Sequence, residues 1–514
     1  MTEPQTRMRV VVLLAAAIHA VMGLISLGAQ SLWLDEVMSL EIATASWAES
    51  ATWFRALPEQ HPLYYLLLRG WTFVFGTTDV GLRALSLVFG VAAVPLAARL
   101  TSRLFGPDEA AVAAVLLGIS PFWLYYSQEG RPYTLLVALV ILATLAWLNV
   151  AQDDRDVPIS RWPYWLVASL GMYTHFFFAF IVMAHALASF VLAKDWRSGL
   201  RNALLVGVPV LVAYLPWLWL ILTHMPEGQD WKGLRHVVFG VPYTFVRFAI
   251  GYGQLVADYR WQDRIVELLR ANALLLLAAG LSYGVLIVRG TLAVRRTRRV
   301  ARVLITTGFL LPLFLPLILT PVVILSGERY FMVILPFFVM LAAAGVRSFA
   351  RSASGGARLL GLGAVIGLSL VTARSLHGHY FNPDFGNEQW EEVLARIAAE
   401  GPEDAIVVVA PDMSEETLRY HLGSATEFRV EVWLPAQGAP DLPDDAVVWL
   451  LVTQLHDPAT VTESFTPEWE VESQRLFPKA TGIWLIRLRR AEERTGTYQP
   501  HSGWIRWHPT PGPA

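Results

Sequence analysis

Two adjacent carboxylates, Asp35 and Glu36, follow the first apolar run of the sequence by only a few residues. A carboxylate beside a long apolar segment is costly unless water solvates it, an opposite charge pairs with it, or a reaction uses it. A positioned carboxylate can act as a general base that takes the proton of a hydroxyl group. An Asp also caps a helix well, and the pair taken alone favours that simpler interpretation.

Three further clusters place polar side chains at the ends of apolar runs. One is a His-Pro pair, which by itself is typical of a helix start. The other two place an arginine between a glutamate and an aromatic residue, and an arginine in so short a loop needs a carboxylate partner or an anionic ligand such as phosphate. The candidate substrate-binding residues from these clusters are His61, Arg131, Tyr133, Glu328, Arg329 and Tyr330.

The composition indicates that these residues are positioned by membrane helices. Of the 514 residues, 55% are hydrophobic and only 16% are charged, a balance that is rare in soluble proteins of this length. The net charge is −2 with the two signs interspersed, which argues against a nucleic-acid partner. The sequence predicts an all-α, multi-pass bundle of about eleven transmembrane helices. The apolar runs lie near 9–29, 82–100, 109–120, 132–150, 162–174, 176–193, 202–222, 271–289, 301–324, 330–346 and 358–374.

The positions of Arg and Lys orient this bundle, because loops rich in these residues stay in the cytoplasm. Alternate loops carry such clusters, including four arginines between positions 295 and 299. With eleven spans the clusters fall on one side, so we expect a cell-membrane protein with a cytoplasmic N-terminus. The segments 30–81 and 223–270 then form outer loops with juxtamembrane helices, and the C-terminal region is also outside.

The composition changes after about residue 375, where charged and mixed segments replace the apolar runs. We expect residues 1–375 to form the transmembrane catalytic domain, 376–494 a small extracytoplasmic α/β domain and 495–514 a flexible tail. Within the small domain, helices are predicted at Asn387–Glu400 and Ser414–His421. Strands are predicted at Ala405–Ala410, Val447–Thr453 and Gly482–Leu488.

Five motifs in matching order carry a family resemblance: SLWLDE, HPLYYLLLRGW, YSQEGRPYTLL, YTHFFF and GERYFMVILPFF. From about residue 10 to about residue 350 the chain resembles the family-39-like glycosyltransferases of the GT-C superfamily. These are relatives of protein O-mannosyltransferases and aminoarabinose transferases and include the RgtA/B/C/D-like group. The chain departs from them in having one proline after His61, where relatives often have two, and Glu388-Gln389-Trp390-Glu391 where they often have Asp-Trp-Arg.

The resemblance implies a GT-C helical bundle that transfers a sugar, with inversion, from a polyprenyl-phosphate donor to a glycan, lipid or protein acceptor outside the membrane. It implies that Asp35 is the general base, with Glu36 as its partner. The leaving phosphate needs positive charge or hydrogen-bond donors rather than an acid, and Arg131, Arg329, His61 and Tyr330 are candidates for that role. A structural role is expected for His175 in the YTH motif. No cofactor is identified, and a divalent metal held by the two acids stays open.

Two other functions remain open from the sequence. A polyprenyl-lipid transporter or flippase would also have many spans, but it is expected to carry ionisable groups at mid-span and interrupted helices in two halves. A non-catalytic lipid-binding component of envelope glycan assembly would share the fold and the membrane-lipid contacts. The charged residues of this chain cluster instead at the outer ends of apolar runs, which favours catalysis at the membrane surface.

Overall fold

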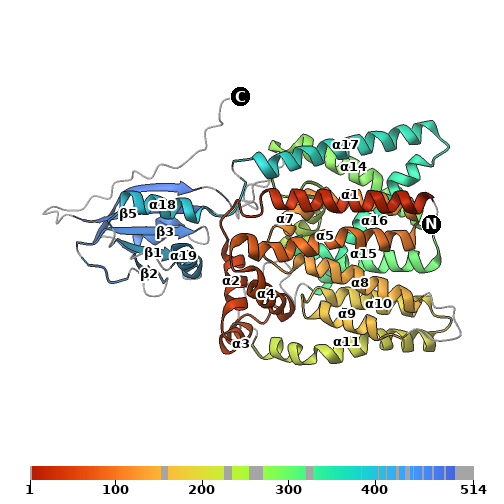
Figure 1. The fold of residues 1–514 in the computed structure, drawn as a ribbon, viewed down its shortest axis with the longest axis horizontal. Coiled ribbons are helices and arrows are strands. Elements are labelled where there is room, and N and C mark those ends of the chain that lie inside the picture. Colours follow the sequence, from red (N-terminus) through yellow and green to blue (C-terminus); the bar gives the residue numbers. More distant parts are fainter. Residues whose placement is uncertain are drawn as a thin grey trace.

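The computed structural model describes residues 3–151, 160–224, 234–253, 270–319 and 328–491, the last range without 384, 403–404, 412–413, 424–427, 435–439, 444, 454–456, 466–467, 478 and 480–481. Long helices lie side by side in one bundle, and a small α/β part stands beyond one end of it (Figure 1). The N-terminus lies at the opposite end of the bundle. The predicted tail 495–514 lies outside the described residues.

Proline and small polar residues begin many of the bundle helices. Pro107, Pro121 and Pro336 each stand in a first turn, where the missing N–H costs nothing, and the Ser120 hydroxyl caps the helix that follows it. The bundle contains α1 (Glu3–Ile25), α5 (Asp79–Leu104), α6 (Pro107–Gly118), α7 (Pro121–Ser127), α8 (Tyr133–Ala151), α9 (Trp162–Met172), α10 (Phe178–Leu192), α11 (Trp196–His224), α12 (Leu234–Ile250), α14 (Ala273–Val294), α15 (Arg299–Leu319), the 3₁₀ helix η1 (Glu328–Ile334), α16 (Leu335–Ala350) and α17 (Gly355–Phe381).

The multi-pass helical fold is confirmed, but the count of eleven spans is not. Each predicted apolar run contains a helix, yet only eight helices of the described residues are long and apolar enough to cross a membrane. A ninth span results if α6 and α7, which meet at a bend of 61°, cross together. The helices α9 and α10 have 11 and 15 residues, short of the about 20 that a bilayer requires. The prediction counted every apolar run as a full pass.

Close helix packing in the bundle depends on two glycines. A Cβ atom at Gly290 of α14 would lie 1.9 Å from the carbonyl oxygen of Leu341, and one at Gly345 of α16 would lie 2.0 Å from that of Leu286. Only glycine permits this backbone approach, as is common between membrane helices. Large apolar side chains such as Leu13 are exposed on the outside of the bundle, where lipid would cover them.

The segment between α1 and α5, which the sequence predicts to be the first outer loop, folds into three short helices at the end of the bundle that faces the α/β part (Figure 1). They are α2 (Leu34–Thr44), α3 (Trp47–Ala56) and α4 (Pro62–Phe75). A reciprocal capping box between Ser46 and Glu49 begins α3, and Pro62 follows the N-cap residue His61 at the start of α4. The expectation of short helices in this segment is therefore confirmed, while its position outside the membrane stays a prediction.

The C-terminal part is a five-stranded sheet in the order β2-β1-β3-β5-β4 with three helices. β1 (Ile406–Ala410) runs parallel to β2 (Arg429–Val432) and β3 (Val448–Thr453), while β5 (Ile483–Arg490) is antiparallel to β3 and β4 (Trp469–Phe477). Every residue of β1 and β3 is buried, as expected for central strands covered on both faces. The helices are α18 (Trp390–Glu400), α19 (Glu415–Leu422) and α20 (Pro458–Glu463). A small C-terminal α/β fold is confirmed, although β2, β4 and α20 were not predicted.

Helix α19 attaches this sheet to the outer loop. The ring of His421 lies 2.9 Å from the carbonyl oxygen of Leu32, just before α2, and the Tyr420 hydroxyl donates a 2.9 Å hydrogen bond to Asp79 at the start of α5. The segment before α18 adds a hydrogen bond of 2.9 Å from the Asn387 side chain to the carbonyl of Ser31. The C-terminal part therefore supports the loop that carries the two acids.

Candidate active site

Asp35 lies in the first turn of α2 and points toward two arginines. Its Oδ2 atom accepts a 3.2 Å hydrogen bond from Nη1 of Arg329 and lies 3.7 Å from Nη2 of Arg131. Within the described residues, Oδ1 accepts no hydrogen bond. The N-cap position of α2 belongs to Trp33, so Asp35 is not the capping residue. A carboxylate that two guanidinium groups hold through one oxygen keeps its second oxygen free to accept a proton.

Arg131, in the loop between α7 and α8, holds the first outer loop in place. Its Nη1 donates to the carbonyl of Asp35 and the hydroxyl of Ser39, both at 3.1 Å, and to the hydroxyl of Tyr65 at 3.3 Å. Its Nη2 donates to the side-chain oxygen of Gln60 at 3.2 Å. The side chain is only 6% exposed. Because these acceptors already occupy both terminal nitrogens, Arg131 is better placed to orient Asp35 than to receive a phosphate.

Arg329 is more accessible and keeps donors free. Its side chain is 32% exposed, and its guanidinium carbon lies 5.6 Å from the centre of the Tyr330 ring. Apart from the bond to Asp35, its N–H groups donate to no residue that the structure describes. The hydroxyl of Tyr133 interacts electrostatically with Arg329 and, like that of Tyr330, makes no hydrogen bond to a described residue. An arginine with free N–H groups beside two free phenols is suited to binding a phosphate.

Glu36 is buried and faces away from this group. Its two oxygens accept hydrogen bonds of 2.8 and 2.7 Å from Nε and Nη2 of Arg83 on α5. Oε1 also accepts a 2.8 Å bond from the backbone N–H of Gly130, and Asn387 approaches Oε2 at 3.4 Å. The structure therefore places Glu36 on Arg83 rather than beside the carboxylate of Asp35. In this position it joins the start of α2 to the loop that carries Arg131.

His61 is buried, and both of its ring nitrogens are occupied. Nδ1 donates to the carbonyl of Glu59 at 2.8 Å, so Nε2 must accept, and it does so from the Tyr214 hydroxyl at 2.7 Å. Burial lowers the pKa of His61 to about 4, so the ring is neutral at ordinary pH. The side chain lies near the cluster through its neighbour His175, whose ring centre is 6.3 Å away. A direct bond from His61 to phosphate would require one of these contacts to break.

Two further points from the sequence concern a binding role for Glu328 and a site for a divalent metal. Glu328 begins η1, but its side chain is outside the described residues, so a binding role for it stays a prediction. Within the described ranges, no three His, Cys, Asp or Glu side chains gather closely enough to hold a metal ion.

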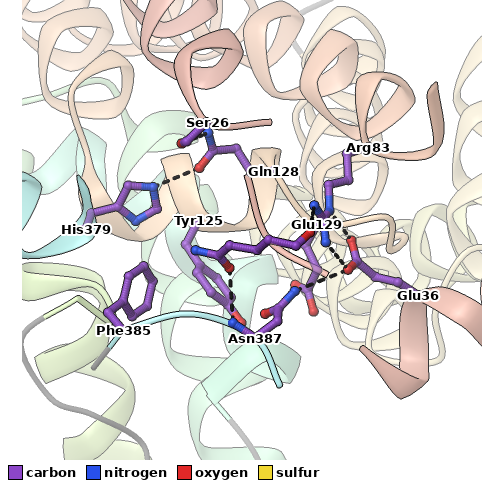
Figure 2. A pocket seen from close by; sticks show the side chains of 10 residues that line it. Ser26, Glu36, Arg83, Tyr125, Gln128, Glu129, His379, Phe385 and Asn387 are labelled. Carbon is purple, nitrogen blue, oxygen red and sulfur yellow. Dashed lines mark hydrogen bonds and ion pairs between the residues drawn. The ribbon is translucent and has the colours of Figure 1, made fainter. Parts of the chain in front are cut away.

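A small polar cavity of about 20 Å³ adjoins Glu36, with room for about one water molecule (Figure 2). Oε2 of Glu129 is buried there without a partner among the described residues, and burial, followed by the charge of Glu36, raises the pKa of Glu129 to about 8. Gln128 accepts a 2.8 Å bond from His379 of α17 on the other side of the cavity. With its pKa raised to about 8, the carboxyl group of Glu129 is protonated at neutral pH. The lining residues are Ser26, Gln30, Glu36, Arg83, Tyr125, Gln128, Glu129, His379, Phe385 and Asn387.

Two buried arginines were missed by the sequence analysis. Arg83 stands one turn into α5. The predicted topology makes this an outer helix end, so the arginine is an exception to the positive-inside pattern, and this signal could have revealed it. Arg247 of α12 is 1% exposed and lies 4.2 Å from the centre of the Tyr252 ring. The hydroxyl of Tyr252 is 2.7 Å from that of Tyr126, whose ring packs against Tyr133 at 5.1 Å. Aromatic contacts thus connect Arg247 to the cluster around Asp35.

A comparison with protein families finds one model, described as dolichyl-phosphate-mannose-protein mannosyltransferase, that matches residues 58–220. This match contains His61, Arg131 and Tyr133 and ends before Arg329. No curated protein sequence matches the chain.

Solved structures resemble almost the whole fold at low sequence identity. ArnT from Cupriavidus metallidurans in the apo state is 15% identical, with 93% of this chain and 97% of that chain covered at a TM-score of 0.57. The same protein bound to undecaprenyl phosphate is 16% identical over the same shares, with a TM-score of 0.54. The Archaeoglobus fulgidus oligosaccharyltransferase in complex with Zn and sulfate is 13% identical, with 92% of this chain and 72% of that chain covered and a TM-score of 0.50. The bundle and the C-terminal part together therefore follow a known membrane fold.

Proposed function

We propose that this chain, a membrane protein with the GT-C glycosyltransferase fold and a mannosyltransferase family match, transfers a sugar from a polyprenyl-phosphate donor to an acceptor hydroxyl. The observation that carries the proposal is the pairing of Oδ1 of Asp35 with the remaining N–H groups of Arg329, all of which are free of hydrogen bonds within the described residues. One group can take a proton while the other receives negative charge. An inverting transfer needs both at one place.

In the proposed reaction, Oδ1 of Asp35 takes the proton of the acceptor hydroxyl as that oxygen attacks C1 of the sugar. The bond between C1 and the phosphate oxygen breaks, and its electron pair leaves with the phosphate. Arg329, with Tyr133 and Tyr330, stabilises this charge through hydrogen bonds that strengthen as it develops. Arg131 and Glu36 are positioning residues. Arg131 donates to the carbonyl of Asp35, and Glu36 accepts from the N–H of Gly130, so the two contacts hold the start of α2 against the loop that carries Arg131.

The donor class is supported by the description of the matching family and by the structure of ArnT with undecaprenyl phosphate. A phosphate on a long apolar chain also suits a polar cluster at the end of a helix bundle, because the chain can lie among membrane helices while the phosphate reaches the arginines. The acceptor is a glycan, lipid or protein with a hydroxyl group.

We propose that the end of the bundle with α2, α3, α4 and the α/β part faces outward, as the arginine pattern predicts. Alkaline phosphatase fused after residue 380, at the end of α17, should then be active. A fusion after Arg298, between α14 and α15, should be inactive. The reverse pair of results would invert this topology.

The central experiment measures sugar release from radiolabelled polyprenyl-phosphate sugars by the purified protein in nanodiscs. Asp35→Asn should lower transfer by about 100- to 10,000-fold while donor binding persists, because the amide keeps the shape but cannot take the proton. The same change at Asp457, the N-cap of α20, is a matched control that should keep full activity. Full activity of Asp35→Asn would reject the assigned base, and donor movement across the membrane without sugar release would favour a transporter.

A further inference from the structure

We propose that His175 is a binding residue for the donor phosphate, to which it presents a neutral Nε2–H donor. The inference rests on the proposed function and deepens it, because it assigns a third kind of donor to the site beside the arginine and the phenols. His175 lies in the turn between α9 and α10, and the sequence analysis gave it a structural role.

The backbone determines which nitrogen of His175 carries the proton. The amide N–H of Phe177 points at Nδ1 of His175 with a separation of 3.1 Å. A backbone amide can only donate, so Nδ1 must offer its lone pair. A neutral imidazole with an accepting Nδ1 carries its proton on Nε2.

This Nε2–H group has no acceptor within the described part of the chain. The residue as a whole is only 7% exposed, but its Nε2 atom is not fully shielded from solvent, so a ligand can reach it. The ring centre lies 5.4 Å from that of Tyr330 and 6.3 Å from that of Tyr133. The His175 ring therefore lies beside the two tyrosine rings that adjoin Arg329.

His175 stays neutral in this position. Burial lowers its pKa well below the usual value, and the nearby His61, Arg329 and Arg131 act in the same direction. A neutral donor adds a hydrogen bond to the phosphate without adding charge that would repel the arginines. It also cannot protonate the leaving oxygen, which is consistent with a phosphate that leaves as an anion.

The neighbouring His61 has no free N–H donor of this kind. The two rings are nearly parallel, with an interplanar angle of 13°, but both nitrogens of His61 are occupied, by Glu59 and Tyr214. Of the two neighbouring histidines, His175 is the one whose proton is free to meet a ligand.

The test measures direct binding of undecaprenyl phosphate and of undecaprenol, which lacks the phosphate, to the full chain in nanodiscs. His175→Phe keeps a flat ring but removes the donor, and it should weaken undecaprenyl phosphate binding about 10-fold or more while leaving undecaprenol binding unchanged. His175→Gln, which retains a terminal N–H, should keep part of the preference for the phosphate.

Unchanged phosphate binding in His175→Phe would overturn the proposal. An equal loss for both lipids would also overturn it, because it would indicate a packing role. Binding is measured without turnover, so this result is separate from the proposed function, which fails if the wild-type protein releases no sugar from any polyprenyl-phosphate donor.

Discussion

The buried ion pair between Glu36 and Arg83 provides the sharpest test of how the site is held. Its shorter contact is 2.7 Å, and the two side chains are 0% and 3% exposed. Removing one member of such a pair leaves a buried charge and typically costs about 3–5 kcal/mol. Arg83 would keep three backbone acceptors, the carbonyls of Leu27, Gln30 and Ser31, at 3.1, 2.8 and 3.1 Å. We therefore expect Glu36→Met to cost about 3 kcal/mol, at the lower end of this range.

The same substitution should also impair catalysis. Glu36 accepts from the N–H of Gly130, and its loss releases the loop next to Arg131 from the helix that carries Asp35. A displacement that weakens alignment by only about 1.4 kcal/mol would lower kcat about tenfold. Glu36→Gln should have a smaller effect on both quantities, because one amide oxygen can still accept.

The assay pairs thermal unfolding in nanodiscs with the rate of sugar transfer. The control is Asp108→Asn at the start of α6, which breaks the ion pairs of Asp108 to Arg347 and Arg351, where the three side chains are 41%, 30% and 56% exposed. An exposed pair contributes about 0–1 kcal/mol, so this variant should unfold close to wild type. If Glu36→Met unfolds at the same temperature as the control, the argument from burial is refuted. If it loses stability but keeps full kcat, Glu36 does not position the site.

Three further predictions follow from the site and its surroundings. Arg329→Ala should weaken undecaprenyl phosphate binding about 10- to 100-fold, since it removes the accessible guanidinium, and unchanged binding would exclude Arg329 from the phosphate site. The pKa of Glu129 is raised to about 8 by burial, so the folded protein holds a proton that the unfolded chain loses above about pH 4.5, and wild-type stability should fall between these values. Glu129→Gln removes this decline, and a variant whose melting temperature falls as much as wild type from pH 5 to pH 8 would contradict the assignment. Burial and the facing carboxyl of Glu416 raise the pKa of Glu41 to about 7, so above pH 7 the contact between α2 and α19 should loosen in wild type. Hydrogen exchange of α19 at pH 5.5 and pH 8 should show this difference, and Glu41→Gln should abolish it.

The sequence by itself determined the class of the fold and most residues of the candidate site, but not the buried Arg83 and Arg247. Apolar runs and the positions of arginines are local properties, because each helix must match the bilayer over its own length. They therefore located the helices and the change of composition at the C-terminal part, and they predict which loops lie outside. The order of short motifs led to the GT-C fold, which the solved structures share.

Only the tertiary structure decided which member of each pair of candidates faces the arginines of the candidate site. Asp35 and Glu36 are neighbours in a helix, where successive side chains point about 100° apart, so just one of them could reach the arginines. Arg83 and Glu36 are 47 residues apart in the chain and meet through packing that no local pattern encodes. The free proton of His175 likewise depends on one backbone amide and the packing of its ring, whereas the two nitrogens of His61 are occupied. Hydrogen-bond partners are set by three-dimensional contacts, and that is why the sequence named Asp35, Glu36, His61 and His175 but not the partner that each of them contacts.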